Sequence, residues 1–437
     1  MIVENITDLI GDTPLIKIPA HITGLKNIDL YGKLEMMNPF GSVKDRVAWH
    51  ILKDDLGDIK DKGQTIFENS SGNTAKAIAA IAGIYGVPFK QVSAMMKVQE
   101  GRDILHLLNA ELEEFAAASD CFDPSDPNDP QFLIEKAVRE SNGQVYFSSQ
   151  FTNEKNPEVH EQTTAQEILA DLGEVDYLIG GLGTTGSTLG LIRAFKKAKK
   201  AFKAIALITQ SGNTVPGIRS LDQMWESGLY QEGVYAHHHV IDEQLALEGL
   251  LTLNRQLGVL CGPSAGANFA GSLSYLQTID AELTERKKAV FIVCDRVEWY
   301  VSYIKERMPE IFGEVPKPNA LFHFKDEAPQ NDIQISAENI APWISEHAPI
   351  IIDIRAPYAY ELGHLDGALN MPIDMFEKLI DGENKPFPQN KKILLVCAMG
   401  EKTRRFAAYL AQKGYDAHNV EDGMLGIKRM NALKNAA

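Results

Sequence analysis

The chain is short of cysteine, short of basic residues and free of long apolar runs, and each shortage excludes a class of protein. Its 437 residues include four cysteines, none in a C-x-x-C motif, so neither a disulfide framework nor a zinc site is predicted. The 59 acidic residues outnumber the 43 basic ones, and the net charge of −16 argues against nucleic acid or an anionic membrane as the main partner.

Signals for export or membrane insertion are also missing. The first eight residues contain no basic segment followed by an apolar one, and no later segment has the length and apolar character of a membrane-spanning helix. We therefore expect a cytoplasmic protein.

At 437 residues the chain is too long for one ordinary domain. Up to about residue 312, short β-branched runs such as 175–179 and 289–293 alternate with helical patterns such as 188–200. This alternation predicts an α/β fold in which helices cover a mostly parallel sheet.

A proline-containing stretch divides the sequence. Residues 313–332 carry three prolines among polar residues with weak periodicity, which is typical of a linker. A second, shorter α/β series follows it. We therefore predict a domain at 1–312, a linker at 313–332 and a small α/β domain at 333–437.

Lys44 stands just after the turn-forming segment 38–42 (Asn-Pro-Phe-Gly-Ser) and at the expected start of an amphipathic helix. An ammonium group there would lie near the positive end of the helix dipole, which favours the neutral amine. A fixed neutral amine is what Schiff-base chemistry with an aldehyde cofactor requires. Taken by itself, a lysine in a first helical turn is more often a solvated surface residue.

A glycine loop at 180–188 (Gly-Gly-Leu-Gly-Thr-Thr-Gly-Ser-Thr) follows an expected strand and leads into a helix. Backbone N–H groups of such a loop bind anions, and threonine hydroxyls add donors. The loop contains a G-x-G-x-x-G motif, but a dinucleotide site also needs an acidic residue about 20 positions later. Because Thr209, Gln210 and Ser211 stand there, a small phosphate group fits better than a dinucleotide.

Two more polar loops open helices. In one, Ser71 and Thr74 could bind a substrate carboxylate and Asn73 a cofactor hydroxyl, although an N-cap cluster is an equally good interpretation. In the other, Ser264 could likewise be a plain N-cap residue. His160 belongs to a fourth polar cluster, and a histidine taken singly is more often structural than catalytic.

Five segments stand in the order and rough spacing of one enzyme family. They are 10–15 (Ile-Gly-Asp-Thr-Pro-Leu), 38–46, 71–74 (Ser-Gly-Asn-Thr), 180–188 and 262–266 (Gly-Pro-Ser-Ala-Gly). Over about its first 312 residues the chain resembles the cysteine synthase/cystathionine β-synthase family of fold-type-II pyridoxal-phosphate enzymes. The resemblance implies two α/β open-sheet subdomains, pyridoxal 5'-phosphate as cofactor and a homodimer.

The resemblance also implies a role for each matching residue. Lys44 would bind the cofactor covalently and then act as acid and base at the substrate α-carbon. Asn73 would contact the pyridoxal 3′-oxygen and Ser264 the pyridine nitrogen, where a neutral hydroxyl favours β-elimination. The phosphate would be held by Gly183, Thr184, Thr185, Gly186, Ser187 and Thr188, and the substrate by Ser71, Gly72, Thr74 and Gln150.

Several segments depart from the family pattern. Ala75 and Ala165–Gln166 replace glycine and Gly-Pro, the run 123–130 resembles an extra loop, and the segment 224–239 matches the substrate-gating region poorly. Three consecutive histidines, His237–His239, cannot all face one metal ion, so we expect a solvated loop there rather than a metal site. These departures concern the second substrate and leave the cofactor unaffected.

Cys397 begins the loop Cys-Ala-Met-Gly-Glu-Lys-Thr between an apolar strand and a helix expected near Thr403. Converging loop amides and the helix dipole would stabilise its thiolate. A buried, inert cysteine is the alternative. A phosphatase would need arginine at the sixth position after the cysteine, where Thr403 stands, so that interpretation fails.

Residues 333–437 resemble a rhodanese (sulfurtransferase) domain. Besides the cysteine loop, the matching segments are 352–355, 363–368, 370–372 and 422–424. The resemblance implies a persulfide on Cys397, with Asp353 and Arg355 tying a strand to a loop. Two loop positions lack the basic residues of many members, so a persulfide or thiol partner is a better expected donor than thiosulfate.

Together these features predict β-replacement that forms L-cysteine from O-acetylserine or O-phosphoserine and a sulfur donor, with Cys397 carrying persulfide sulfur. The expected partners are small amino-acid and sulfur compounds. Three alternatives stay open. One is a cysteine desulfhydrase, which releases pyruvate, ammonia and sulfide. Another is a non-catalytic sulfur-binding or regulatory module, against which Lys44, Asn73 and Ser264 argue. The third, a nicotinamide dehydrogenase, lacks its ribose-binding acid.

Overall fold

The structure is a computed structural model that describes residues 2–70, 72–94, 96, 98–115, 130–198, 201–209, 215–314, 333–380 and 386–436. Within these residues the chain forms two compact units, the first from residues 2–115 and 130–304 and the second from residue 305 onward. The predicted linker at 313–332 lies almost wholly outside the described residues. The predicted domain boundaries therefore stay predictions.

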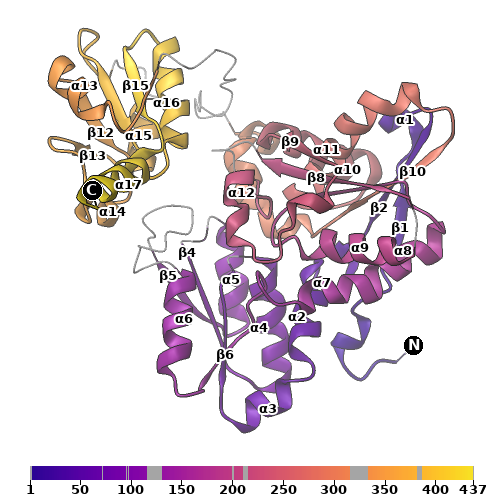
Figure 1. Cartoon of the computed structure of the whole chain (residues 1–437). Coiled ribbons are helices and arrows are strands. Elements are labelled where there is room, and N and C mark those ends of the chain that lie inside the picture. Colours follow the sequence, from indigo (N-terminus) through magenta and orange to yellow (C-terminus); the bar gives the residue numbers. More distant parts are fainter. Residues whose placement is uncertain are drawn as a thin grey trace. The chain divides into compact units, whose positions relative to one another are not determined.

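A six-stranded sheet runs through the first unit (Figure 1). All its neighbouring strands are parallel except the first two, which pair antiparallel. Helices cover both faces, because alternate residues of the central strands pack in two separate cores. In order across the sheet, the strands are β1 (Leu15–Lys17), β2 (Ile28–Lys33), β10 (Lys287–Ile292), β7 (Tyr177–Gly181), β8 (Lys203–Thr209) and β9 (His237–Ile241).

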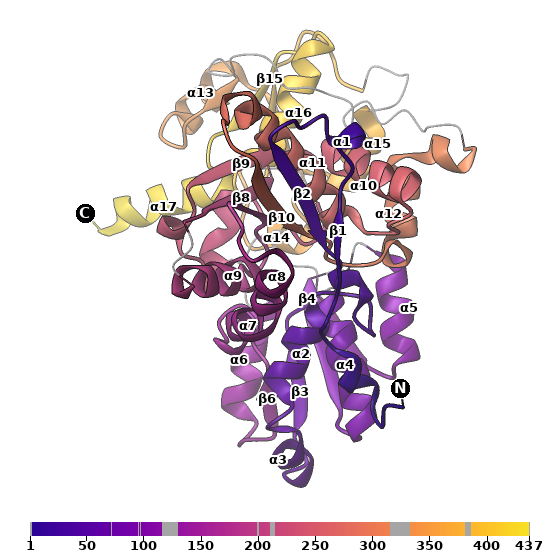
Figure 2. The ribbon, with the colours of Figure 1, turned by 90° about the vertical axis from the view of Figure 1, so that its right-hand side faces the viewer.

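A second sheet in the same unit has four parallel strands, in the order β5 (Glu111–Phe115), β4 (Phe89–Ala94), β3 (Thr65–Glu68) and β6 (Val145–Phe147). On it lie α2 (Lys44–Leu52) and α4 (Asn73–Tyr85), which pack side by side (Figures 1 and 2). Two open sheets with helices in one unit confirm the predicted fold class.

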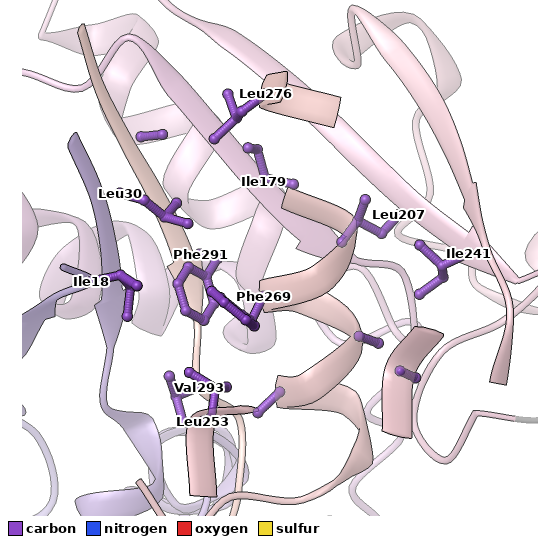
Figure 3. Packing of buried hydrophobic residues seen from close by; sticks show 14 of the residues in the cluster. Ile18, Leu30, Ile179, Leu207, Ile241, Leu253, Phe269, Leu276, Phe291 and Val293 are labelled. Atoms are coloured by element: carbon purple, nitrogen blue, oxygen red, sulfur yellow. The ribbon is translucent and has the colours of Figure 1, made fainter. Parts of the chain in front are cut away.

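The core of the larger sheet fixes the position of one predicted site residue. Helix α11 (Pro263–Ile279) packs on β10, and the rings of Phe269 and Phe291 lie 5.9 Å apart between them (Figure 3). Burying one phenylalanine stabilises a fold by about 1.5–3 kcal/mol. Helix α10 (Glu243–Leu257) approaches α11 so closely that a Cβ on Gly266 would lie 2.3 Å from a carbonyl oxygen of α10. The start of α11, with Ser264, is thereby held rigidly.

Further helices and turns complete this part of the chain. The α-helices are α1 (Ala20–Thr23), α3 (Leu56–Asp61), α5 (Gln99–Leu107), α6 (Pro130–Glu140), α7 (Lys155–Val159), α8 (Ala165–Leu172), α9 (Gly186–Lys197) and α12 (Val301–Arg307). A π-helical turn covers His160–Thr164. The 3-10 turns are Ile6–Leu9, Glu35–Met37, Leu221–Glu226, Glu232–Val234, Asp280–Glu282, Val297–Tyr300 and Pro309–Phe312.

The second unit is a five-stranded parallel sheet in the order β11 (Gln334–Ile335), β15 (Ala417–Val420), β14 (Ile393–Val396), β12 (Ile350–Asp353) and β13 (Leu369–Asn370). Every residue of the central strand β14 is fully buried, and alternate residues pack in two separate cores. Helices therefore cover both faces. They are α13 (Ile340–His347), α14 (Pro357–Glu361), α15 (Ile373–Ile380), α16 (Glu401–Gln412) and α17 (Gly423–Ala436).

One local expectation was wrong. His237–His239 form strand β9 rather than a solvated loop, because the three residues pair in parallel register with β8. The ring of His238 bonds the Tyr230 hydroxyl at 3.0 Å, and that of His239 bonds Ser274 at 2.6 Å. Among the described residues, no helix has both the length and the apolar character needed to cross a membrane.

Candidate active site

Lys44 is the first residue of α2, and the turn before it is fixed by its neighbour Asp45. The Asp45 carboxylate accepts hydrogen bonds from the Phe40 amide at 2.6 Å and from the Ser42 hydroxyl at 3.0 Å. The Ser42 hydroxyl in turn accepts from the Lys44 amide at 3.2 Å. Burial raises the pKa of Asp45 to about 7, against the effects of these donors. The lysine is thus placed by a closed local network.

A buried ionic network anchors the first turn of α2 from the other side. Arg46 bonds Glu35 at 2.7 Å and Glu167 at 2.7 Å, and Lys33 contacts Glu167 at 2.7 Å. Burial raises the pKa of Glu167, but Arg46 and Lys33 outweigh it and lower that pKa to about 2. Two cations therefore balance two carboxylates, which is the condition for burying such a group without a large desolvation penalty.

The segment 294–296, which follows β10, joins the Lys44 turn to the Ser264 turn. The amide of Val43 donates to the Cys294 carbonyl at 2.8 Å, and the amide of Gly262 donates to the Asp295 carbonyl at 3.0 Å. Burial lowers the pKa of the half-buried Lys44 amine, although Cys294 and Asp295 act to raise it. The net lowering favours the neutral amine that was predicted there.

Asn73, at the start of α4, is tied to the same segment. Its amide nitrogen donates to Asp295 at 2.6 Å and to the Tyr300 hydroxyl at 3.2 Å, and Tyr300 donates to Asp295 at 2.6 Å. Burial raises the pKa of Asp295, against the effect of its hydrogen bonds. Asn73 Oδ1 and Asp295 Oδ1 are buried and have no hydrogen-bond partner among the described residues. Two acceptor atoms are thus left open beside Lys44.

Ser264 lies in the first turn of α11 and is joined to the glycine loop through Asn268. The hydroxyl of Ser264 is hydrogen-bonded to the Cys294 thiol, whose pKa burial raises to about 12. The side-chain nitrogen of Asn268 lies 3.4 Å from the Cys294 sulfur. The side-chain oxygen of Asn268 accepts a hydrogen bond from the Gly181 amide at 2.8 Å. One asparagine therefore spans the ends of β7 and β10.

The glycine loop between β7 and α9 is packed so tightly that its glycine positions have no room for a side chain. A Cβ on Gly183 would lie 2.6 Å from the Gly217 carbonyl oxygen, and one on Gly186 would lie 2.0 Å from Asn156 Oδ1. Thr185 has a left-handed φ of 66°, and its buried hydroxyl has no partner in the part of the chain that the structure describes. This is a donor-lined cradle with an unused hydroxyl, as an anion site requires.

Several of the predicted contact residues already have protein partners. The Thr184 hydroxyl accepts from Asn156 at 3.1 Å, whereas the Thr188 hydroxyl donates to the Thr185 carbonyl at 3.0 Å. The Thr74 hydroxyl donates to the Gln150 side chain at 2.6 Å. Ser187 is half-buried. The predicted roles of these residues toward ligands stay predictions.

Gln150 closes the loop that precedes α4. Its side-chain nitrogen donates to the Asn69 carbonyl at 3.2 Å. Beneath the loop, the buried Glu68 accepts from Ser148 at 2.6 Å, and burial raises the pKa of Glu68 to about 7. Gly72 immediately precedes the helix, whereas Ser71 lies outside the described residues.

Three residues of this site were not predicted from the sequence. Cys294, Asp295 and Tyr300 contact the predicted residues. Cys294 and Asp295 could have been predicted from their place just after an apolar strand, because ligands in α/β folds bind at the carboxyl ends of strands.

The donor set fits pyridoxal phosphate, the cofactor that the resemblance implies. The glycine loop with Thr185 offers amides and a hydroxyl for a phosphate, and Lys44 offers an amine for an aldehyde. Asn73 and Ser264 offer side chains for the oxygen and nitrogen of the ring. Lys44, Asn73 and Ser264 all border the segment 294–296.

In the second unit, Cys397 directly follows the central strand β14 and faces the start of α16. Its sulfur accepts from the Gly400 amide and the Thr403 hydroxyl, each at 3.2 Å. The amides of Met424 and Leu425 bind the carbonyls of the two residues that begin the loop, each at 3.0 Å. Those carbonyls therefore point away from the sulfur. The helix begins at Glu401, two residues before the expected Thr403.

Asp353 and Arg355 brace the same sheet end. Arg355 binds the Asp353 carboxylate through its side chain at 2.5 and 2.9 Å and also donates to the Gly363 carbonyl at 2.8 Å. The Asn370 side chain donates to the Asp353 and Arg355 carbonyls at 3.2 and 2.9 Å. These contacts join β12, β13 and the loop between them.

Comparison with known proteins gives a family match for each of the two domains. Residues 6–295 match the pyridoxal-phosphate dependent enzyme family, and residues 336–430 match the rhodanese-like domain. Cysteine synthase B of Pseudomonas aeruginosa is 31% identical over 301 residues, which cover 68% of this chain and 96% of that protein. Cystathionine beta-synthase of Apis mellifera is 32% identical over 333 residues, covering 71% of this chain and 63% of that protein.

A solved structure gives the same result. The O-acetyl serine sulfhydrylase isoform 3 of Entamoeba histolytica superposes with a TM-score of 0.60 at 27% identity, covering 69% of this chain and 91% of that one. The chain belongs to the family of pyridoxal-phosphate dependent enzymes, uses pyridoxal phosphate as its cofactor and also contains a rhodanese-like domain.

Proposed function

We propose that the first domain forms L-cysteine from an O-activated serine and sulfide, and that Cys397 of the second domain carries sulfur as a persulfide. One observation carries the first part. The Lys44 amine, whose pKa burial lowers, borders the segment 294–296, which also contacts Asn73 and Ser264. The relatives named cysteine synthase and O-acetyl serine sulfhydrylase support this reaction.

The chemistry divides between the cofactor and the chain. Bound pyridoxal phosphate supplies the electron sink that lets the substrate lose its α-proton and its β-ester. Lys44, as a neutral amine, accepts the α-proton and returns it after sulfide has added. The loop around Gly72 and Thr74, with Gln150, orients the substrate carboxylate. O-acetylserine and HS⁻ then give cysteine and acetate, without net oxidation or reduction.

The assigned contacts belong to the same proposal. Lys44, Asn73 and Ser264 hold the cofactor ring and its aldehyde, and the glycine loop 183–188 holds its phosphate. Ser71, Gly72, Thr74 and Gln150 bind the substrate. We further propose domain limits of 1–312 and 333–437, a homodimer and a cytoplasmic location.

Sulfur transfer at Cys397 requires no oxidant. The thiolate attacks the outer sulfur of a persulfide donor R–S–SH, the S–S bond breaks, R–S⁻ leaves, and Cys397–S–SH forms. The Gly400 amide and the helix N-terminus stabilise the negative sulfur in this step. Two low-molecular-weight thiols R–SH can then reduce the persulfide: they become one disulfide R–S–S–R, sulfide leaves and the Cys397 thiol is restored. This sulfide would serve the first domain.

The test supplies the full chain with O-acetylserine, O-phosphoserine or cysteine and measures cysteine and pyruvate. Faster cysteine formation from one serine ester with sulfide supports the proposal and names the ester. Faster pyruvate formation from cysteine would overturn it in favour of a cysteine desulfhydrase.

The role of Lys44 has a readout independent of turnover. Borohydride reduction of the loaded protein should fix the pyridoxyl group to the peptide that contains Lys44, as mass spectrometry detects. Lys44→Ala should lose this label, whereas the matched variant Lys53→Ala should keep it. A label on another lysine would refute the assignment.

A further inference from the structure

The hydroxyl of Thr403 lies among three acceptor atoms in the rhodanese-like unit. It stands 3.2 Å from the Cys397 sulfur, 3.3 Å from the Gly400 carbonyl oxygen and 2.5 Å from the side-chain oxygen of Asn419. A hydroxyl has one hydrogen and can donate fully to only one of them. The shortest of these contacts points to Asn419 as the partner that decides where the hydrogen goes.

Asn419 is itself an unusual residue for its place. It lies in β15, which is paired with β14 on one side and β11 on the other, and it is fully buried. Asparagine is depleted in strands, and a buried amide needs partners for its polar atoms. Its side-chain nitrogen has none within the described residues. The packing of the sheet alone therefore gives no reason for an asparagine there.

Rotating the side-chain amide of Asn419 by about 180° explains both its contact with Thr403 and the lack of a partner for its nitrogen. The oxygen and nitrogen of an asparagine side chain are nearly identical in shape, so their assignment follows from the hydrogen-bond network. With nitrogen toward Thr403, the amide donates to the hydroxyl oxygen, and the hydroxyl hydrogen is directed to the Cys397 sulfur. The amide oxygen then occupies the site without a partner, which is tolerated better than a buried lone donor.

We propose that Asn419 is a positioning residue that acts through Thr403 to stabilise negative sulfur on Cys397. The chain of donors runs from the Asn419 amide to the Thr403 hydroxyl and from there to the sulfur, and each bond polarises the next. The Gly400 amide supplies a second, fixed donor at 3.2 Å. This inference rests on the proposed sulfur transfer at Cys397, for which the relay would favour the attacking thiolate.

The two orientations of Asn419 predict opposite effects of one substitution. If the amide feeds a hydrogen bond to Thr403, Asn419→Leu weakens the relay and moves the pH midpoint of Cys397 alkylation upward. If the amide oxygen instead takes the hydroxyl hydrogen, the same variant frees that hydrogen for the sulfur, and the midpoint moves downward. A residue that only fills space would leave the midpoint unchanged.

The experiment follows iodoacetamide alkylation of the full chain against pH, with the Cys397 peptide quantified by mass spectrometry. Thr403→Val should slow alkylation near neutral pH by about tenfold, since a charge-assisted hydrogen bond is lost. Thr403→Ser should restore the wild-type profile, and Asn419→Leu should raise the midpoint by less than Thr403→Val. Circular dichroism and thermal unfolding of each variant report whether the fold is kept.

The outcomes separate this inference from the proposed function. A downward or unchanged midpoint in a folded Asn419→Leu protein overturns the relay. Should that variant fail to fold, failure of Thr403→Ser to restore what Thr403→Val loses would overturn it. Persulfide loading of Cys397 from glutathione persulfide is measured separately. A shifted midpoint without any loading would refute sulfur transfer and leave the relay intact.

Discussion

Replacing Gly186 with alanine should damage the phosphate cradle of the first unit far more than its small size suggests. Gly186 begins α9, and an added Cβ would lie 2.0 Å from Asn156 Oδ1 and 2.3 Å from Asn156 Cγ. Ordinary contacts of this kind exceed about 3.4 Å, so the asparagine side chain must move by more than an ångström. The Asn156 side chain is 1% exposed, so it is surrounded by protein rather than by solvent.

The cost follows from the bonds that Asn156 would give up. Its amide nitrogen donates to the Gln150 carbonyl at 2.8 Å and to the Thr184 hydroxyl at 3.1 Å. Each bond contributes about 0.5–1.5 kcal/mol, and overpacking costs about 1–3 kcal/mol more. Alanine regains less than about 1 kcal/mol through helix propensity. We expect a net loss of about 2–4 kcal/mol and a cofactor affinity weakened by at least about tenfold, since the donors of the cradle shift.

Gly83→Ala is the matched control, because Gly83 also lies in a helix, α4, and a Cβ there would meet no atom within 4 Å. It should stabilise the protein slightly. Urea unfolding measures the stability of both variants, and fluorescence titration with pyridoxal phosphate measures their affinity. A Gly186→Ala protein that matches Gly83→Ala in stability and affinity would refute the reasoning.

Three further predictions concern the surrounding networks. Arg46→Met should destabilise the first unit by about 3–5 kcal/mol in urea unfolding, because it removes the cation paired with the buried Glu35, whereas Glu167 keeps Lys33. Arg193→Met, from an exposed ion pair, should cost below about 1 kcal/mol, and equal losses would contradict this. Burial raises the pKa of Glu68 from 4.5 to about 7, so the folded state binds its proton more tightly and stability falls as pH rises through this window. The wild-type free energy of unfolding should therefore fall by up to about 3 kcal/mol between pH 4.5 and 7, and Glu68→Gln should not show this fall. Identical pH profiles of unfolding for the two proteins would argue against this reasoning. Gly400→Ala should abolish persulfide loading of Cys397, because its φ is 83° and a Cβ would lie 2.6 Å from a carbonyl oxygen; Gly414→Ala, with a similar φ of 86° but open space, should keep loading.

The parts of the fold that could be predicted are those determined by residues that are neighbours in the sequence. Turn residues followed by an amphipathic helix located Lys44, and a strand followed by glycines located the loop 180–188. Cys397 was located in the same way, between an apolar strand and a helix. In each case the turn, the strand end and the helix start are contiguous, so a short window of sequence contains the whole signal.

The parts that were missed depend on contacts between distant segments. Asp295 belongs to the site because it meets Asn73, 222 residues earlier in the chain. Asn419 reaches Thr403 across neighbouring elements of the second unit. The register of β9 with β8, which places His237–His239 in a strand, is likewise set by tertiary pairing. Such contacts between distant segments cannot be predicted from a local sequence pattern, because they depend on the order of the strands in the sheet.

In both candidate sites the dipole of a helix acts on the reactive residue, but with opposite consequences for its charge. Lys44 and Cys397 each stand at the amino end of a helix beyond a parallel sheet, where the helix dipole is positive. This field disfavours an ammonium and favours a thiolate, so it assists a neutral amine in the first unit and a negative sulfur in the second. Burial reinforces the first effect, because it lowers the pKa of Lys44. At the buried Cys397, two donors are aimed at the sulfur, the Gly400 amide and the Thr403 hydroxyl. Burial and the helix end therefore act together on the lysine, whereas the cysteine sulfur has two hydrogen-bond donors aimed at it.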